Sequence, residues 1–212
     1  MKLTWLGHAC YQIENEQGNI LLIDPYDPQL GYPKIQAKAD IVTTSHGHYD
    51  HNYTEDLPEG FVLLDDGQPY HGLGFDVYGV ASFHDDAEGA KRGANWIYVI
   101  ETDGLRIVHL GDLGHALSAK QLTQLGRVDI LLLPIGGFYT IDANQAVDVM
   151  RAIRARVTIP MHYRNRWWTS ENILPIEAFT SLVESKQLPT NGITCTHETI
   201  TDLPDVIVLE YQ

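Results

Sequence analysis

The sequence predicts an α+β protein in which two mixed β-sheets pack face to face and helices lie on the outer faces. Short strand-like runs fill the first half of the chain, and strands alternate with helices in the second half. Hydrophobic residues make up 44% of the 212 residues, which is enough for a sizeable buried core. Because no linker or low-complexity run divides the chain, we expect a single domain over residues 1–212.

The predicted strands of the first half are short apolar runs that glycine and proline separate. In chain order they cover residues 3–6, 10–14, 19–23, 41–45, 61–64, 74–83, 96–101 and 106–110. Asp103-Gly104 lies between the last two runs, and this dipeptide favours a tight hairpin turn.

Three helices are predicted in the second half. Ser118 and Gln121 form a capping box at the start of the first helix, and Gly126 offers its stop. A second helix opens at Asp142, with apolar residues at helical spacing, and a third follows Pro175. The strands predicted between and after these helices cover residues 130–133, 157–160 and 206–209.

Composition narrows the classes of partner. The formal net charge of −14 repels a phosphate backbone, so we expect no nucleic-acid binding. No apolar stretch reaches the roughly 18 residues of a membrane span, and we expect neither a membrane partner nor a signal peptide. Two cysteines make no disulfide framework, which favours a reducing, cytoplasmic setting. The sequence is also compatible with a homo-oligomer.

Residues 46–51, HGHYDH, are the most informative stretch of the chain. They directly follow a strand-like run and hold three imidazoles and one carboxylate. Neutral imidazole and carboxylate are ligands that Zn²⁺, Fe²⁺ and Mn²⁺ favour. Residues at i and i+2 share a direction in extended chain, so His46 and His48 can face one metal. The following turn can aim Asp50 and His51 at a second metal.

The HxHxDH pattern resembles the signature of the metallo-β-lactamase superfamily. Four further residues fit the other motifs of that family in order, each at the end of a strand-like run: Asp24, His84, Asp112 and His162. The runs WLGHA at 5–9 and LPIGG at 133–137 are similar to the small "metal-dependent hydrolase" branch, which includes relatives of ascorbate-6-phosphate lactonase.

The resemblance implies an αββα four-layer sandwich and a binuclear metal site. It assigns His46, His48 and His84 to one metal, Asp50, His51 and His162 to the other, and Asp112 to the bridge between them. It also implies that Asp24 accepts a hydrogen bond from a ligand imidazole and that His8 lies beside the metals. Zinc is the expected metal, with manganese and iron as alternatives.

The chemistry that such a site supports is hydrolysis. Two neighbouring cations lower the pKa of a shared water towards neutrality, so that hydroxide is the nucleophile and no Ser or Cys nucleophile is required. Besides the bridging Asp112, Asp50 is a candidate catalytic residue, because its carboxyl group could carry a proton to the leaving group.

A small anionic ester, lactone or phosphodiester is the expected substrate. Cationic and aromatic residues follow two of the presumed ligands closely, and they are candidates for substrate binding: Lys91, Arg92, Arg164, Arg166 and Trp167. The competing interpretation is that the arginines pair with surface carboxylates, and that Trp167 and Trp168 pack a loop or a subunit interface.

Four other functions are alternatives to this interpretation. A nuclease or RNA-processing phosphodiesterase is the main alternative, and the acidic charge counts against it. An oxygen- or flavin-linked enzyme usually has acidic residues in place of some histidines. A non-catalytic binding module is disfavoured by the complete ligand set. True β-lactamase activity does not suit a cytoplasmic protein.

Overall fold

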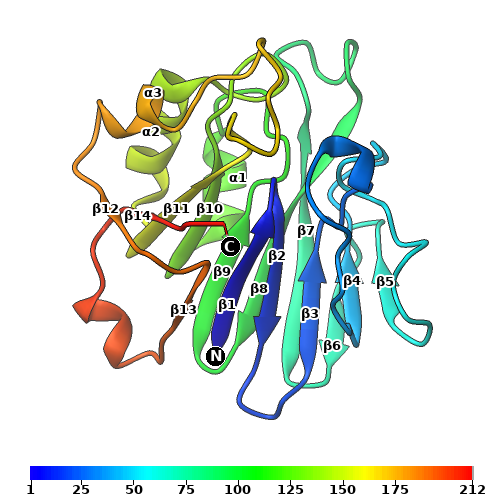
Figure 1. Ribbon diagram of the computed structural model, residues 1–212. Coiled ribbons are helices and arrows are strands. Elements are labelled where there is room, and N and C mark those ends of the chain that lie inside the picture. Colours follow the sequence, from blue (N-terminus) through cyan, green and yellow to red (C-terminus); the bar gives the residue numbers. More distant parts are fainter. Residues whose placement is uncertain (212) are drawn as a thin grey trace.

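The computed structural model describes residues 1–211, and its framework is a pair of six-stranded mixed sheets packed face to face (Figure 1). We call them sheet 1 and sheet 2. Sheet 1 has the order β13-β1-β2-β3-β4-β5. Its strands are β1 (Lys2–Gly7), β2 (Cys10–Glu14), β3 (Ile20–Ile23), β4 (Ile41–Thr43), β5 (Val62–Leu64) and β13 (Gly192–Thr194).

Sheet 2 has the order β11-β10-β9-β8-β7-β6, so its central strands follow one another along the chain. Its strands are β6 (Tyr70–Gly72), β7 (Phe75–Phe83), β8 (Ala94–Thr102), β9 (Leu105–His109), β10 (Ile130–Pro134) and β11 (Val157–Met161). β12 (Lys186–Gln187) and β14 (Ile207–Val208) form a separate, short parallel ladder. This ladder lies beside sheet 2, because β14 contacts β11.

Side-chain alternation explains why the strands of sheet 1 are apolar on both faces. Tyr11, Ile13 and Leu21 point into the main core shared with sheet 2. Cys10 and Leu22 point the opposite way, into a second cluster. That second cluster is built mainly by an irregular segment, residues 26–39, which contains the 3₁₀ turn η1 (Pro28–Leu30).

The three α-helices, α1 (Ala119–Leu125), α2 (Ala143–Ile153) and α3 (Glu177–Thr180), lie on the side of sheet 2. Helix α1 contacts β7, α2 contacts β10, and α3 packs on α2. The predicted two-sheet sandwich is therefore confirmed. Among the described residues, the outer face of sheet 1 is covered by irregular chain rather than by an α-helix.

Several local predictions are confirmed. Both capping boxes form: Ser118 with Gln121 at α1 and Asp142 with Gln145 at α2. Gly126 ends α1 with φ +63°. Strands β8 and β9 form an antiparallel hairpin whose loop is Asp103-Gly104, with both residues at positive φ.

The third helix is shorter than its apolar pattern predicts. α3 covers only four residues, and no side chain caps its N-terminus at Ile176. Six residues after its end the chain is extended again, because Lys186 pairs with Ile207 in the β12–β14 ladder. The apolar residues at 182 and 183 therefore lie in a turn.

Strand direction places the functional loops. β3 and β4 are parallel neighbours in sheet 1, and β9, β10 and β11 are parallel neighbours in sheet 2. β1 runs in the direction of β3 (arrowheads in Figure 1), because each is antiparallel to β2, and β7 likewise shares the direction of β9. The segments that follow these strands gather at one end of the sandwich. Among the described residues, no helix is long and apolar enough to cross a membrane.

Candidate metal centre

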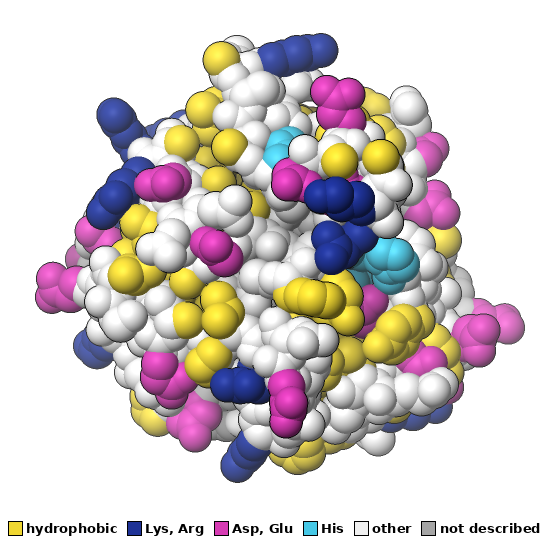
Figure 2. Space-filling view, turned by 90° about the horizontal axis from the view of Figure 1, so that it is seen from above, with side chains coloured by type: hydrophobic (Ala, Val, Ile, Leu, Met, Phe, Trp, Pro, Cys, Tyr) yellow, Lys and Arg dark blue, Asp and Glu magenta, His cyan; other side chains and the backbone are white. Residues whose placement is uncertain are grey.

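The predicted ligand residues converge at this end of the sandwich, although they come from both sheets. His84 follows β7 immediately, and His162 follows β11 immediately. Asp112 comes shortly after β9, and the HGHYDH segment, residues 46–51, follows β4. Figure 2 looks onto this face, where histidine, basic and hydrophobic side chains lie next to one another.

Asp112 lies between two groups of imidazoles, and each of its carboxylate oxygens faces one group. Oδ1 lies 3.2 Å from Nε2 of His51 and 3.2 Å from Nε2 of His162. Oδ2 lies 3.0 Å from Nε2 of His84 and 3.9 Å from Nε2 of His46. The carboxylate is only 2% exposed. This is the geometry by which one carboxylate could serve two neighbouring ions.

Two sets of potential ligand atoms are compact enough to hold an ion, with all atoms of a set within 4.8 Å of one another. One set is His46, His48 and His84, which are the three residues assigned to one metal by sequence. The other is His8, Asp50, His51 and His162. A third, overlapping set joins Asp112 to one histidine from each of these two.

Asp24 fixes the orientation of two of these imidazoles, although it lies outside the ligand sets. Its fully buried carboxylate accepts from Nδ1 of His51 (2.8 Å) and from the backbone N–H of Ser45 (2.7 Å). The Ser45 hydroxyl also donates to Asp24, at 2.6 Å. That hydroxyl has a single proton, so it must accept at its 2.9 Å contact with Nδ1 of His46. In their neutral form both imidazoles therefore carry the proton on Nδ1 and have the Nε2 lone pair available for an ion.

Asn95 holds the loop that carries Asp112, and nothing in the sequence pattern indicated it. Its side-chain oxygen accepts from the Asp112 backbone N–H (2.9 Å), and its amide donates to Leu110 O and to Ser82 Oγ. Gly111 lies between Leu110 and Asp112 and has φ +55°. A Cβ at this position would clash with the Asn95 side chain.

His8 belongs to the site itself. The residue is fully buried, and its Nε2 hydrogen-bonds to Asp50 Oδ2 at 3.2 Å. Its ring centroid lies 4.3 Å from that of His162 and 5.1 Å from that of His51. His8 has φ +53° in the turn between β1 and β2, which turns it towards the second ligand set.

The electrostatics of the cluster favour ionised carboxylates among mostly neutral imidazoles. Burial alone would raise the pKa of Asp112, but His162 and His51 hold it well below its usual range. Burial and the neighbouring His51 lower the pKa of His46 to about 3. Burial and His162 lower the pKa of His8 to about 4. The pKa of His51, which Asp112 and Asp50 flank, and the pKa of His84, which hydrogen-bonds to Asp112, are raised against the effect of burial.

Orphaned atoms provide the test of whether metal ions fit these residues. Buried ligand-type atoms face the cluster and make no hydrogen bond within the described residues: His46 Nε2, His51 Nε2, His162 Nε2 and Asp112 Oδ1. Buried polar atoms normally find a partner, because an unmade hydrogen bond costs about 1–3 kcal/mol. Imidazole nitrogens and carboxylate oxygens that approach one another without bonding suit shared cations. The donor set of imidazoles and carboxylates therefore fits divalent transition metals.

The loop after His84 is organised by Asp85, the residue next to this predicted ligand. The buried carboxylate of Asp85 accepts four backbone N–H groups, from Ala87, Gly89, Lys91 and Arg92, at 2.7–2.9 Å. Although desolvation opposes the shift, these bonds lower the pKa of Asp85 to about 2. Both oxygens of Asp85 accept hydrogen bonds from the loop backbone, and Asp85 belongs to none of the ligand sets.

The predicted substrate residues lie in two places. Arg92 lines a groove of about 510 Å³ together with His46 and His48. The Lys91 side chain is exposed and pairs with Asp86 at 2.6 Å. Arg164 is half-buried, and its backbone N–H donates to Leu174 O.

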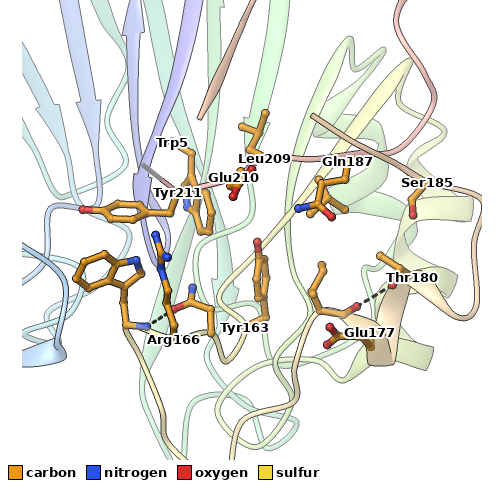
Figure 3. Close-up of a pocket in the computed structure, with 14 residues that line it drawn as sticks. Trp5, Tyr163, Arg166, Glu177, Thr180, Ser185, Gln187, Leu209, Glu210 and Tyr211 are labelled. Carbon is orange, nitrogen blue, oxygen red and sulfur yellow. Dashed lines mark hydrogen bonds between the residues drawn. The ribbon is translucent and has the colours of Figure 1, made fainter. Parts of the chain in front are cut away.

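Arg166 and Trp167 line a different cavity, of about 600 Å³, together with Trp5, Tyr163 and Tyr211 (Figure 3). The Arg166 guanidinium carbon lies 5.2 Å from the centre of the Trp167 ring. No metal-ligand candidate lines this cavity. A role of Arg164, Arg166 and Trp167 in substrate binding thus stays a prediction.

Trp168 has a position beside the metal centre that the sequence did not assign. Its ring centroid lies 4.5 Å from that of His8 and 5.0 Å from that of His162. Both contacts are edge-on, so the indole forms an apolar wall behind the second ligand set.

A protein-family model described as the beta-lactamase superfamily domain matches residues 2–162, which include every predicted ligand. The chain belongs to the metallo-β-lactamase superfamily. A UPF0173 metal-dependent hydrolase of Thermoplasma volcanium is 30% identical over 191 residues, which cover 77% of this chain and 83% of that protein. The family is therefore that of metal-dependent hydrolases.

Solved structures of the superfamily agree. A Thermotoga maritima protein assigned as a zinc-dependent hydrolase of the metallo-β-lactamase superfamily superimposes with a TM-score of 0.82 and 34% identity. The alignment covers 100% of this chain and 99% of that one. An isothiocyanate hydrolase from Delia radicum gut bacteria has a TM-score of 0.64 at 15% identity, and it covers 100% and 97% of the two chains; this likeness shows the fold alone.

Proposed function

We propose that this protein is a binuclear metal-dependent hydrolase of a small anionic ester, lactone or phosphodiester. The observation that carries the proposal is Asp112, whose two oxygens each face a separate group of histidines. Zinc is the proposed metal, in line with the zinc dependence assigned to the Thermotoga maritima relative, and manganese and iron are alternatives. Bound together, two such ions would supply a hydroxide nucleophile at neutral pH.

The roles of the chain's own residues follow from their contacts. His46, His48 and His84 would hold one ion, and Asp50, His51 and His162 the other. Asp24 keeps the Nε2 lone pairs of His46 and His51 available for the ions.

The proposal gives Asp50 a second role, in proton transfer. Its side chain is 15% exposed at the edge of the cluster, and Nε2 of His8 lies 3.2 Å from its Oδ2. A carboxylate that is both anchored by a buried imidazole and open to solvent can receive a proton and pass it to a leaving group. His8 would then position Asp50 rather than touch the substrate.

We propose a small molecule as the substrate rather than a nucleic acid, because the net charge is −14 and the groove beside His46 and His48 has one cation, Arg92, in its lining. The test is a hydrolysis screen of the metal-loaded protein against lactones, carboxylic esters, phosphodiesters and a short RNA. The expected result is turnover of a small anionic compound that stops on chelation and returns with zinc. RNA cleavage without small-molecule turnover would favour the nuclease alternative.

A further inference from the structure

Large apolar side chains are exposed around the mouth of the metal centre. Tyr49 is 56% exposed and lies between the predicted ligands His48 and Asp50. Phe138 is 56% exposed and Tyr139 is 37% exposed, and both lie in the loop after β10. The rings of Phe138 and Tyr139 pack edge to face, with their centroids 4.7 Å apart. Grouped exposed aromatics at a site mouth indicate a binding surface.

The loop that carries Phe138 is fixed to the metal centre. Gly136 packs against the backbone of His162 so closely that a Cβ would clash with the His162 carbonyl oxygen. Ile141 donates its N–H to Leu113 O, next to the bridging carboxylate, at 2.8 Å. These two contacts tie the loop after β10 to the segments that carry His162 and Asp112.

Phe138 itself has an unfavourable combination of properties. Its φ is +52°, a left-handed conformation that costs a bulky residue free energy, and its ring is largely in water. The Phe138 ring belongs to neither hydrophobic cluster, so its exposed face is open to a ligand at the rim of the site.

Arg92 supplies charge beside this aromatic pair. Its guanidinium carbon lies 5.7 Å from the centre of the Phe138 ring and 5.6 Å from that of Tyr139. Asp85 fixes its backbone N–H at 2.7 Å. Among the described residues, no carboxylate forms an ion pair with Arg92, whereas Lys91 beside it is paired with Asp86. An ordered, unpaired arginine is a ready partner for a carboxylate or phosphate.

We propose that Phe138, Tyr139 and Arg92 form the substrate-recognition site of this enzyme, and that the substrate is an anion attached directly to an apolar, preferably aromatic, group. The inference rests on the proposed hydrolase function and narrows its substrate class. Arg92 holds the anionic group beside His46 and His48, and the exposed face of Phe138 takes the apolar group.

Binding of two simple phosphonates tests the proposal without requiring turnover. Phenylphosphonate and methylphosphonate have the same charged group, so direct contacts of that group with metal affect both equally. Titration calorimetry on the metal-loaded protein should give about tenfold tighter binding of phenylphosphonate, as expected when a phenyl ring is partly buried. Phe138→Asn should reduce that preference to less than twofold, because Asn tolerates positive φ but offers no ring. Arg92→Gln should weaken both ligands about tenfold.

Leu73→Asn is the matched control, because Leu73 is 44% exposed with φ +53° in the turn before β7, and it should leave both affinities unchanged. Equal binding of the two phosphonates by the unmodified protein, or a preference that survives Phe138→Asn, overturns the proposal. A Phe138→Asn variant that loses a dimer in sedimentation, with unchanged phosphonate binding, would make the rim a subunit contact and also overturn it. Phenyl preference without hydrolysis in any screen would instead reject the proposed function.

Discussion

Replacing Asp24 by Asn should impair both metal sites at once, although Asp24 is not itself a proposed ligand. The substitution keeps the size of the side chain and exchanges one oxygen for an amide that donates. If that amide lies at the Oδ2 position, it faces Nδ1 of His51 and donates to the Ser45 hydroxyl. The hydroxyl would then donate to His46 Nδ1, and both imidazoles would carry their proton on the nitrogen that faces the site.

The opposite orientation of the introduced amide is also unfavourable. It places the amide against the Ser45 backbone N–H, which now donates to Oδ1 at 2.7 Å, so two donors would oppose each other. Either way a hydrogen bond to a charged group is lost in a fully buried position, worth about 1.5–3 kcal/mol. If the same free energy is lost from the binding of metal by His46 and His51, metal affinity falls about 10- to 100-fold.

The assay is competition for zinc between the purified protein and a coloured chelator, with thermal unfolding recorded in parallel. The chain offers a control of the same chemistry: Asp76 accepts from His71 Nδ1 at 2.7 Å, but both side chains are largely exposed. Asp76→Asn should change neither metal affinity nor stability measurably. If Asp24→Asn binds zinc as tightly as the unmodified protein, the argument that Asp24 sets the imidazole protonation is refuted.

Three further predictions follow from the same contacts. Asn95→Ala should lower the free energy of unfolding by about 2–3 kcal/mol in a denaturant titration, because it orphans the Asp112 N–H and the Leu110 carbonyl; an unchanged midpoint would contradict this. A single turnover in ¹⁸O-labelled water should place the label directly in product, since no covalent enzyme intermediate is expected, and label found in the protein would argue for one. If Arg164 and Arg166 bind the anion, as the sequence predicts, their joint replacement by Ala should raise KM about 10- to 100-fold for an anionic substrate and leave a neutral analogue unaffected; an unchanged KM for both substrates would leave the anion to Arg92, as the structure favours.

The convergence of the candidate ligands was predictable because chemistry and topology point the same way. His46, His84, Asp112 and His162 each follow a strand-like run, and the strands concerned share one direction within their sheets. Parallel strands bring such residues to one end of the sandwich without any knowledge of packing. The hairpin at Asp103-Gly104 and the capping boxes were equally predictable, because their signals are local.

The supporting contacts were not predictable, because they join residues far apart in the chain. Trp168 against His8 and Asn95 beneath Asp112 depend on how the sheets and loops pack. Strands β6, β12 and β13 were not predicted either, because two or three residues are too few to show an alternation of apolar and polar side chains. The irregular segment, residues 26–39, that covers sheet 1 has no periodic signal, although its apolar side chains are buried as thoroughly as a helix face.

The central claim is that one carboxylate, Asp112, joins two metal ions. Elemental analysis of the purified protein, reconstituted with zinc and dialysed, tests it most directly when the unmodified chain and Asp112→Ala are compared. We predict two zinc ions per chain in the unmodified protein and loss of both in the variant, because each oxygen of Asp112 faces one histidine group. One zinc per chain at saturation, or a variant that retains two, would contradict the binuclear site.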